Sequence, residues 1–313
     1  MIRKRIITSR ISPLQRREPL DRYLANRFTY LTQDQWKQEV IDGRISLDGA
    51  IATNPSTALS GGEMLSWDGS RIIEPDVDRG ITILYEDEWF VAVNKTGNLP
   101  VHPSGPYFNN TLVALLEERY GQKVYPAHRI DRETSGIILL AFNGKSAHDL
   151  SESLAKGSKE YLALVHGCFP DQETIVDLPL GRDAESAVNK RRKAWPGGTQ
   201  KALTRFRKIL TAREFSLVRC FPETGRLHQI RAHLKSAGFP IVGDKLYGRE
   251  ENAFLEFIRN GFTGGLEERL LLPRSALHAA RLVILHPHTQ EKIIIRAPLP
   301  EMFVDFIRKK KSP

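Results

Sequence analysis

Residues 128–136 read His-Arg-Ile-Asp-Arg-Glu-Thr-Ser-Gly and run directly into the apolar segment Ile-Ile-Leu-Leu-Ala at 137–141. The apolar segment predicts a buried strand, and the polar stretch before it predicts a loop that leads directly into that strand. Asp131 lies between Arg129 and Arg132 in this loop, and a neighbouring cation favours the ionised form of a carboxylate. Such a loop can present a carboxylate to a ligand. The spacing alone fits a surface ion pair in a turn at least as well.

Five more blocks accompany this stretch in order along the chain. They comprise Tyr85–Lys95, Lys159–Val165, Glu223–His233, Gly243–Gly248 and Leu277–Ala279. Together with residues 128–136 they resemble the RluA-like family of RNA pseudouridine synthases, and the resemblance covers roughly residues 80–300. One departure is Thr96, where the family usually has proline after Asn-Lys. This change removes a rigid turn but touches no catalytic role.

The pattern of secondary structure indicates an α+β fold. Beyond residue 80 the strand-like segments outnumber the helical ones, and the two do not alternate as in a doubly wound sheet. Helices are expected over residues 111–120 and 228–236. The family resemblance implies the pseudouridine synthase fold, with a mixed, mainly antiparallel central sheet and a catalytic cleft. We expect this catalytic domain to occupy residues 81–313.

The first 73 residues are expected to form a separate RNA-binding domain with a basic N-terminal arm, joined to the rest by a linker at 74–80. Short amphipathic helices are predicted near residues 20–28 and 35–41, with a cap for the second at 32–35. A hairpin is predicted across Asp48-Gly49, followed by another short strand at 61–67. This unit resembles the S4 RNA-binding domain, and residues 41–49 carry the resemblance.

The resemblance implies which residues act on the uridine. Asp131 matches the essential aspartate and would act as nucleophile or as base toward the sugar. Arg226 is expected to pair with it and keep it ionised, the alternative being a structural salt bridge. Tyr161 is expected to stack on the target base, the alternative being an ordinary core tyrosine.

Pseudouridine formation breaks the glycosidic bond, turns the base and rejoins it through carbon 5, so it needs no cofactor. The chain has neither a dinucleotide-binding glycine motif after a strand nor a phosphate loop. His228 and His233 are five residues apart, which points them in different directions on a helix, and no His-Glu-x-x-His motif occurs. We therefore expect neither a cofactor nor a metal site.

The charge indicates a polyanionic partner. The formal net charge is +9, and basic residues gather in two stretches. Residues 1–27 hold eight Lys or Arg against two acids, and residues 190–213 hold nine with no acid. The stretch 190–204 is predicted to be a mobile basic loop that closes over bound RNA. Arg308–Lys311 fits a solvated tail equally well.

Individual RNA contacts are predicted from this pattern. Arg129 is expected to act as a wedge that fills the space of the flipped base. Lys95 is expected to contact phosphate, or to be a solvated lysine at a strand end. The remaining predicted contacts are Arg22 and Arg44 in the N-terminal domain and Lys190, Arg191 and Arg192 in the basic stretch.

The leading hypothesis is an RNA pseudouridine synthase that acts on structured RNA, with large-subunit ribosomal RNA or a pre-ribosomal particle as partner. The alternatives are a transfer-RNA pseudouridine synthase, and a non-catalytic ribosome-assembly factor on the same scaffold. With two cysteines, no signal-peptide pattern and no apolar run longer than 136–142, we expect a cytoplasmic monomer that does not engage membranes. The acidic and apolar stretch 249–270 has no function assigned by the sequence.

Overall fold

The computed structural model describes residues 5–13, 16–28, 30–250 and 252–311. The chain divides into two compact units by its internal contacts. The large unit comprises residues 78–101 and 120–313, and the small unit comprises residues 1–77 and 102–119. All six family-like sequence blocks fall within the large unit.

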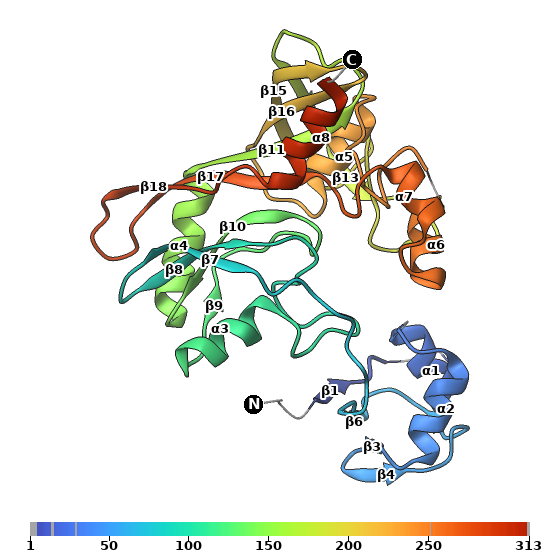
Figure 1. The fold of residues 1–313 in the computed structure, drawn as a ribbon. Helices are drawn as coiled ribbons and strands as arrows, with labels where there is room; N and C mark the ends of the chain where they lie inside the picture. Colours follow the sequence, from blue (N-terminus) through green and yellow to red (C-terminus); the bar gives the residue numbers. More distant parts are fainter. Residues whose placement is uncertain (1–4, 14–15, 29, 251, 312–313) are drawn as a thin grey trace. The chain divides into compact units, whose positions relative to one another are not determined.

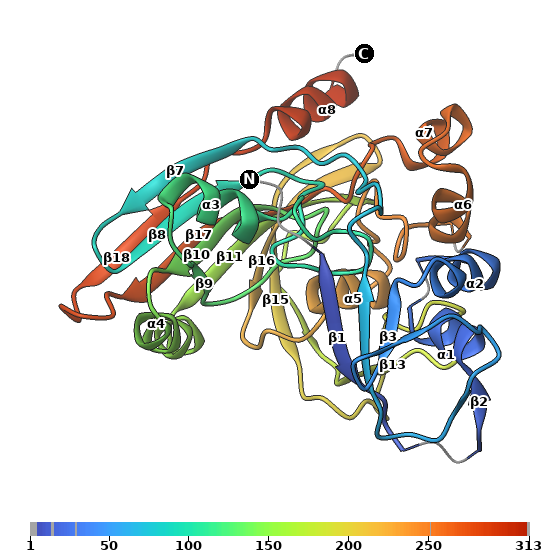
Figure 2. The same ribbon diagram turned by 90° about the horizontal axis from the view of Figure 1, so that it is seen from below.

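The large unit is built on one ten-stranded sheet, whose main path runs β12-β15-β16-β11-β17-β10-β8-β7 (Figures 1 and 2). β18 pairs with β17, and β9 pairs with β10. The strands are β7 (Ile81–Glu86), β8 (Phe90–Lys95), β9 (Tyr125–Pro126), β10 (Ser135–Ala141), β11 (Ser158–His166), β12 (Thr174–Asp177), β15 (Leu203–Ala212), β16 (Phe215–Pro222), β17 (Leu277–Leu285) and β18 (Lys292–Arg296). Among the described strands of this sheet, every pairing is antiparallel except β10–β17. The predicted α+β class with a mixed, mainly antiparallel sheet is confirmed.

Strand β10 forms the centre of the core, since all seven of its residues are buried. Helix α4 (Gly144–Lys156) follows β10. Its N-cap is Asn143, whose side chain accepts a hydrogen bond from the Ser146 amide at 2.8 Å. Its Leu150 and Leu154 pack with Ile137 and Leu139 of β10 in one apolar cluster. Because β10 is buried along its whole length, the loop before it is attached to the most buried strand of the sheet.

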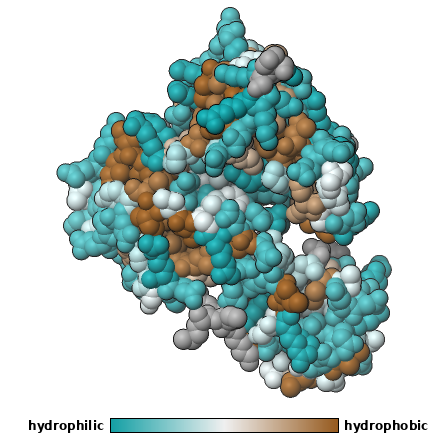
Figure 3. Space-filling model, in the orientation of Figure 1, coloured by the Kyte–Doolittle hydropathy of each residue, from teal (hydrophilic) through white to brown (hydrophobic). Residues whose placement is uncertain are grey.

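Two more helices cover the half of the sheet formed by β11, β15 and β16. Helix α5 (Gln229–Ser236) and helix α8 (Glu301–Lys311) contribute Ile230, Leu234, Phe303 and Phe306 to a second apolar cluster. On the face drawn in Figure 3, apolar residues gather in patches within a mainly hydrophilic surface. Within the described ranges, none of the helices combines the length and apolar character needed to cross a membrane.

Gly136 lets β10 and β17 pair closely, and its replacement by alanine tests this. Its φ is +108°, and an added Cβ would meet the backbone of Ala279, its partner in the parallel register. Gly136→Ala is expected to lower the free energy of unfolding by roughly 3 kcal/mol or more, because strain and overlap add. Urea denaturation measures the change. Gly144→Ala is the control: nothing lies within 4 Å of its added Cβ, so a small gain of up to about 1 kcal/mol is expected. Equal stabilities of the two variants would contradict the argument.

The part of the small unit up to residue 68 has two helices and short strands within the described residues. Its elements are β1 (Ile6–Arg10), β2 (Glu18–Pro19), α1 (Leu20–Arg27), α2 (Gln33–Ile41), β3 (Ile45–Leu47), β4 (Ala50–Ala52), β5 (Ala58–Leu59) and β6 (Met64–Asp68), with a four-stranded sheet of order β1-β6-β3-β4. The predicted helices near 20–28 and 35–41 are confirmed. The predicted cap is present as well, since the Thr32 side chain accepts from the Gln35 amide and the Gln35 side chain accepts from the Thr32 amide. The predicted hairpin is confirmed, with Asp48 and Gly49 at φ +48° and +84°.

The small unit also holds residues 102–119, although the sequence prediction placed them within the domain 81–313. Arg5 donates hydrogen bonds to the carbonyls of Gly105 and Pro106 at 2.8 and 2.9 Å. Glu74 accepts from the backbone amides of residues 108, 109 and 110 at 2.7 to 2.8 Å. Helix α3 (Leu112–Tyr120) follows, as predicted for residues 111–120. The segment stays with the small unit because its backbone groups are satisfied there.

The basic stretch 190–204 contains the second strand of a short hairpin, which the prediction of a loop did not include. Strand β14 (Arg192–Ala194) pairs with β13 (Leu180–Arg182), and Leu180 and Gln200 exchange backbone hydrogen bonds at 2.8 and 2.9 Å. Gly198 fits here because an added Cβ would meet the backbone of Pro179. The turn indicated by the two glycines and the proline is present, since the Gly198 amide donates to the Trp195 carbonyl at 3.0 Å. The strand β14 was not predicted because its pairing partner lies upstream in the chain.

Candidate active site

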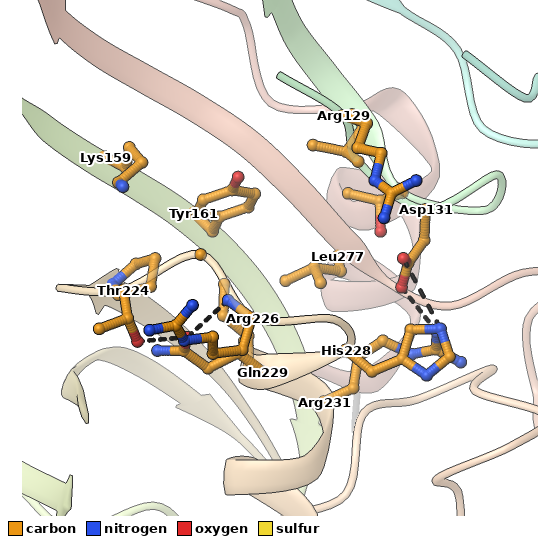
Figure 4. Close-up of a pocket in the computed structure, with 15 residues that line it drawn as sticks. Arg129, Asp131, Lys159, Tyr161, Thr224, Arg226, His228, Gln229, Arg231 and Leu277 are labelled. Atoms are coloured by element: carbon orange, nitrogen blue, oxygen red, sulfur yellow. Dashed lines mark hydrogen bonds and ion pairs between the residues drawn. The ribbon is translucent and has the colours of Figure 1, made fainter. Parts of the chain in front are cut away.

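An open pocket of about 110 Å³ lies over the sheet of the large unit, and four segments line it (Figure 4). The loop before β10 contributes Arg129 and Asp131, and β11 contributes Lys159 and Tyr161. The turn and first residues of α5 contribute Arg226, His228 and Arg231, and β17 contributes Leu277. Residues far apart in sequence therefore meet around Asp131.

The loop that carries Asp131 is held by its backbone. The Thr134 amide donates to the Asp131 carbonyl at 3.1 Å, which closes a turn. The Arg132 carbonyl accepts from the Leu99 amide at 3.2 Å and from Nζ of Lys95 at 3.1 Å. These bonds fix the loop between the end of β8 and the start of β10, so Asp131 has a defined position.

Lys95 is fully buried, and the expectation that it contacts phosphate or is solvated is wrong. Its Nζ donates to the carbonyls of Thr96 and Arg132 at 2.8 and 3.1 Å. Burial, with a smaller contribution from Arg274, lowers its pKa well below the ordinary value. The reason is topological: β8 lies between β10 and β7, so its end is inside the unit.

Asp131 is paired with Arg231, one hundred residues later in the chain. Nη1 of Arg231 donates to Oδ2 of Asp131 at 2.6 Å. The same guanidinium makes a two-point contact with Asp244, with Nε to Oδ2 at 2.6 Å and Nη2 to Oδ1 at 2.9 Å. Asp244 is fully buried and also accepts from the amides of Leu246 and Tyr247. Arg231 is thus fixed on one side and offers its remaining nitrogen to Asp131.

This arrangement keeps Asp131 ionised. Burial by itself raises the pKa of its carboxyl, but the charge of Arg231 and its hydrogen bond outweigh this and hold the pKa below the usual value. His228 Nε2 lies 3.8 Å from Oδ1 of Asp131, too far for a hydrogen bond. Burial, and then the charge of Arg231, lowers the pKa of His228 to about 4. His228 is therefore uncharged at neutral pH, and Arg231 supplies the counter-charge.

Comparison with known proteins shows the family of the chain. A family model described as RNA pseudouridylate synthase matches residues 89–236. The ribosomal large subunit pseudouridine synthase D of Zymomonas mobilis is 32% identical over 300 residues, which cover 90% of each chain. The chain belongs to the RluA-like family of RNA pseudouridine synthases.

Two further similarities are informative. The mitochondrial tRNA pseudouridine(32) synthase of Saccharomyces cerevisiae is 34% identical over 221 residues, which are 70% of this chain and 48% of that protein. The solved structure of human RNA Pseudouridylate Synthase Domain Containing 4 is 26% identical with a TM-score of 0.56, covering 73% of this chain and 92% of that chain. The solved structure confirms the pseudouridine synthase fold, and both proteins are named as members of the same enzyme class.

In this synthase the predicted pairing of Arg226 with Asp131 is wrong. Arg226 lines the pocket, but its side chain is exposed and its Nε donates to the Lys201 carbonyl at 3.2 Å. It lies in the turn before α5, whereas Arg231 lies on the helix and faces Asp244. Both arginines belong to the same sequence block, and spacing offered no means of choosing between them. The second carboxylate, Asp244, was the signal that the sequence prediction did not use.

Tyr161 is brought into the pocket with Asp131, as expected for a residue that meets the target base. It is half-buried on β11, two residues after Lys159, so both side chains lie on one face of the strand (Figure 4). Burial, followed by the charge of Asp131, raises the pKa of the Tyr161 hydroxyl. Tyr161 therefore keeps its proton throughout the neutral range.

The other predicted RNA-contact residues have varied surroundings. Arg129 is exposed and lines the pocket, and Lys190 is exposed on the basic hairpin. Arg191 pairs with Asp183 at 3.3 Å. The Arg192 side chain donates to the carbonyls of residues 189 and 191, and its amide donates to the Tyr247 hydroxyl at 2.7 Å.

In the small unit, Arg22 is exposed on α1. Arg44 is paired with Asp42 at 2.6 Å and with Glu39 at 3.3 Å. Its charge is partly neutralised by these two carboxylates, which would compete with phosphate.

Proposed function

We propose that the synthase converts specific uridines of large-subunit ribosomal RNA to pseudouridine, with Asp131 as the essential carboxylate. The observation that carries the proposal is the Asp131–Arg231 ion pair in the pocket, at 2.6 Å. An isomerisation that starts at the sugar requires one carboxylate that stays ionised at neutral pH. Arg231 maintains that state in Asp131.

Asp131 acts either as a nucleophile on the sugar or as a base that removes a proton from it. In both routes the bond between the sugar and N1 breaks, the freed uracil turns, and carbon 5 forms the new bond to the sugar. Carbon 5 then loses its proton and N1 gains one, so the number of protons is unchanged. Asp131 leaves the sugar, or returns to it the proton that it removed, and is again ionised. Substrate and product are isomers, so the balance requires no other reactant.

The remaining pocket residues serve the base and its strand. The target uridine must leave its stack, which costs a few kcal/mol in folded RNA. Tyr161 stacks on the flipped base, worth about 1–3 kcal/mol. Arg129, exposed at the pocket, fills the vacated space with its guanidinium plane.

Support for ribosomal RNA comes from the small unit and from the relatives. The two helices and the hairpin of residues 20–52 are the parts on which the likeness to an S4 RNA-binding domain rests. Relatives matched over most of both chains are named ribosomal large subunit pseudouridine synthase D, in Zymomonas mobilis and Vibrio cholerae. The yeast relative named for transfer RNA makes transfer RNA the second candidate substrate. We place the reaction in the cytoplasm, with ribosomal RNA or a pre-ribosomal particle as partner.

Pseudouridine mapping in cells that lack the protein tests the proposal. Carbodiimide-blocked primer extension across ribosomal and transfer RNA should lose one or a few stops in large-subunit ribosomal RNA. The wild-type chain should restore them, and Asp131→Asn should not, because the amide is of similar shape but cannot act as nucleophile or base. Loss of transfer-RNA stops alone would favour the second substrate. Rescue by Asp131→Asn would refute the assigned role of Asp131.

A further inference from the structure

The segment 252–270, for which the sequence suggested no function, lies against the loop that carries Asp131. It forms helix α6 (Ala253–Asn260) and helix α7 (Gly264–Leu270). Ala253, Leu266 and Leu270 make a small apolar cluster with Phe257 packed on it. The two helices are therefore packed against each other through their own apolar residues, and the rings of Phe257 and Phe262 are presented toward Lys245.

Lys245 is enclosed by these rings. Its Nζ lies 4.9 Å from the ring centre of Phe257 and 5.4 Å from that of Phe262. Its side chain is only 4% exposed, and Nζ donates to Oε1 of Glu133 at 2.8 Å and to the Pro273 carbonyl at 2.6 Å. A lysine buried in this way is held in one position, since its ammonium must keep these partners.

Glu133 transfers this constraint to the catalytic loop. It lies two residues after Asp131, and its Oε2 accepts from the Ser275 amide at 3.1 Å. Its carbonyl accepts from Nη1 of Arg274 at 3.1 Å. The neighbouring Arg132 stacks over the Phe257 ring at 5.7 Å. The loop is thus anchored both to the segment before β17 and, through Lys245 and Phe257, to helix α6.

Lys245 directly follows Asp244 in the chain. Asp244 forms an ion pair with Arg231, which is the counter-ion of Asp131. Lys245 forms an ion pair with Glu133, which lies on the same loop as Asp131. Two adjacent residues therefore set the relative position of the two halves of the ion pair. Lys245 therefore adds a side-chain contact to the backbone bonds of the loop, and it does so on the side of the ion pair opposite to Arg231.

We propose that Lys245, enclosed by Phe257 and Phe262 of the α6–α7 segment, is a positioning residue that holds the 131–135 loop so that Asp131 meets Arg231. The inference rests on the proposed role of Asp131. The α6–α7 segment thereby supports the active-site loop through its contacts with Lys245 and Arg132. A displacement of about 1 Å at a reacting group can cost about 100-fold in rate, so loss of this support has a measurable effect on the rate.

The test compares Lys245→Met, which keeps the length of the side chain and removes its charge, with wild type in the full chain. Single turnover on a defined RNA substrate should slow by about 100-fold, while RNA binding stays within about twofold of wild type. The double variant Glu133→Gln/Lys245→Met should lose no more of the rate than the slower single variant, because both substitutions remove the same Lys245–Glu133 ion pair. Lys156→Met, the same charge change at a side chain 79% exposed on α4, is the matched control.

The pH dependence of the rate separates positioning from general destabilisation. Displacement of Asp131 from Arg231 raises the pKa of its carboxyl, so the acid limb of the profile should move to higher pH in Lys245→Met. A purely structural role would lower the folded fraction without moving this limb. A normal rate with an unmoved limb, additive losses in the double variant, or a loss confined to RNA binding would each overturn the inference.

A second pair of variants decides the matter if Lys245→Met does not fold. Phe257→Leu/Phe262→Leu keeps Lys245 and loosens its enclosure, and should give about a tenfold loss of rate with the same direction of pH shift. Ile258→Ala, at an exposed position of the same helix, should match wild type. Full activity of Asp131→Asn would refute the proposed function. Inactive Asp131→Asn together with fully active Lys245 and phenylalanine variants would refute this inference alone.

Discussion

Arg231→Met should lower the rate of pseudouridine formation by roughly 10²- to 10³-fold and should also destabilise the large unit. The variant leaves the carboxylates of Asp131 and Asp244 close together without their shared counter-ion. Burial then raises the pKa of Asp131, so the active ionised form is depleted and loses its orientation. Removing one partner of a buried ion pair typically costs about 3–5 kcal/mol of stability. Single-turnover assays and urea denaturation measure the two effects.

Arg226→Met provides the comparison within the same pocket. The Arg226 side chain is exposed, and its Nε donates to the Lys201 carbonyl. The loss of this side chain should change the free energy of unfolding by no more than about 0.5 kcal/mol. Any rate loss should leave the acid limb of the pH profile in place, because Arg226 does not neutralise Asp131. An Arg226→Met variant as unstable as Arg231→Met would contradict the assignment of the counter-ion.

Three buried histidines should make the large unit lose stability in mild acid. Burial lowers the pKa values of His128, His228 and His278 from 6.5 to about 4, with smaller contributions from Lys159, Arg231 and Arg274 respectively. As pH falls from 6.5 toward 4, the unfolded chain takes up protons at these rings and the folded chain does not. The free energy of unfolding therefore falls by about 1.4 kcal/mol per pH unit for each histidine, or roughly 4 kcal/mol per pH unit for these three together.

Urea denaturation at several pH values, with hydrogen exchange of β10 and β11 amides as the reporter, measures this slope. His128→Gln isolates one histidine, because its amide oxygen can still accept from the Leu139 amide that His128 Nε2 now binds at 3.2 Å. The slope should fall by about 1.4 kcal/mol per pH unit. Asp131 and Asp244 have lowered pKa values, so their contribution is lost only below about pH 4, where the unfolded carboxyls take up protons while the folded ones stay ionised. A stability that is constant between pH 6.5 and 4.5 would show that the rings are already protonated in the fold.

Local sequence signals predicted the secondary structure well where the interactions are themselves local. The Thr32–Gln35 cap joins residues three apart, and the Asp48-Gly49 turn joins neighbouring residues of one hairpin. The uniformly apolar run 137–141 lies in a strand whose seven residues are all buried. Strand β14, within the basic stretch 190–204, was missed because its partner strand, β13, begins ten residues before that stretch and carries no distinctive pattern.

The sequence by itself determined the family, through one aspartate in a characteristic loop, a tyrosine and an arginine-containing block in a fixed order. Only the tertiary structure decided which arginine serves Asp131, because Arg226 and Arg231 share a block and the choice depends on α5 facing a buried Asp244. It also decided that Lys95 is interior and that residues 252–270 lie against the active-site loop. These outcomes depend on contacts between residues far apart in the chain. Sheet order and helix packing set such contacts, and residue spacing cannot.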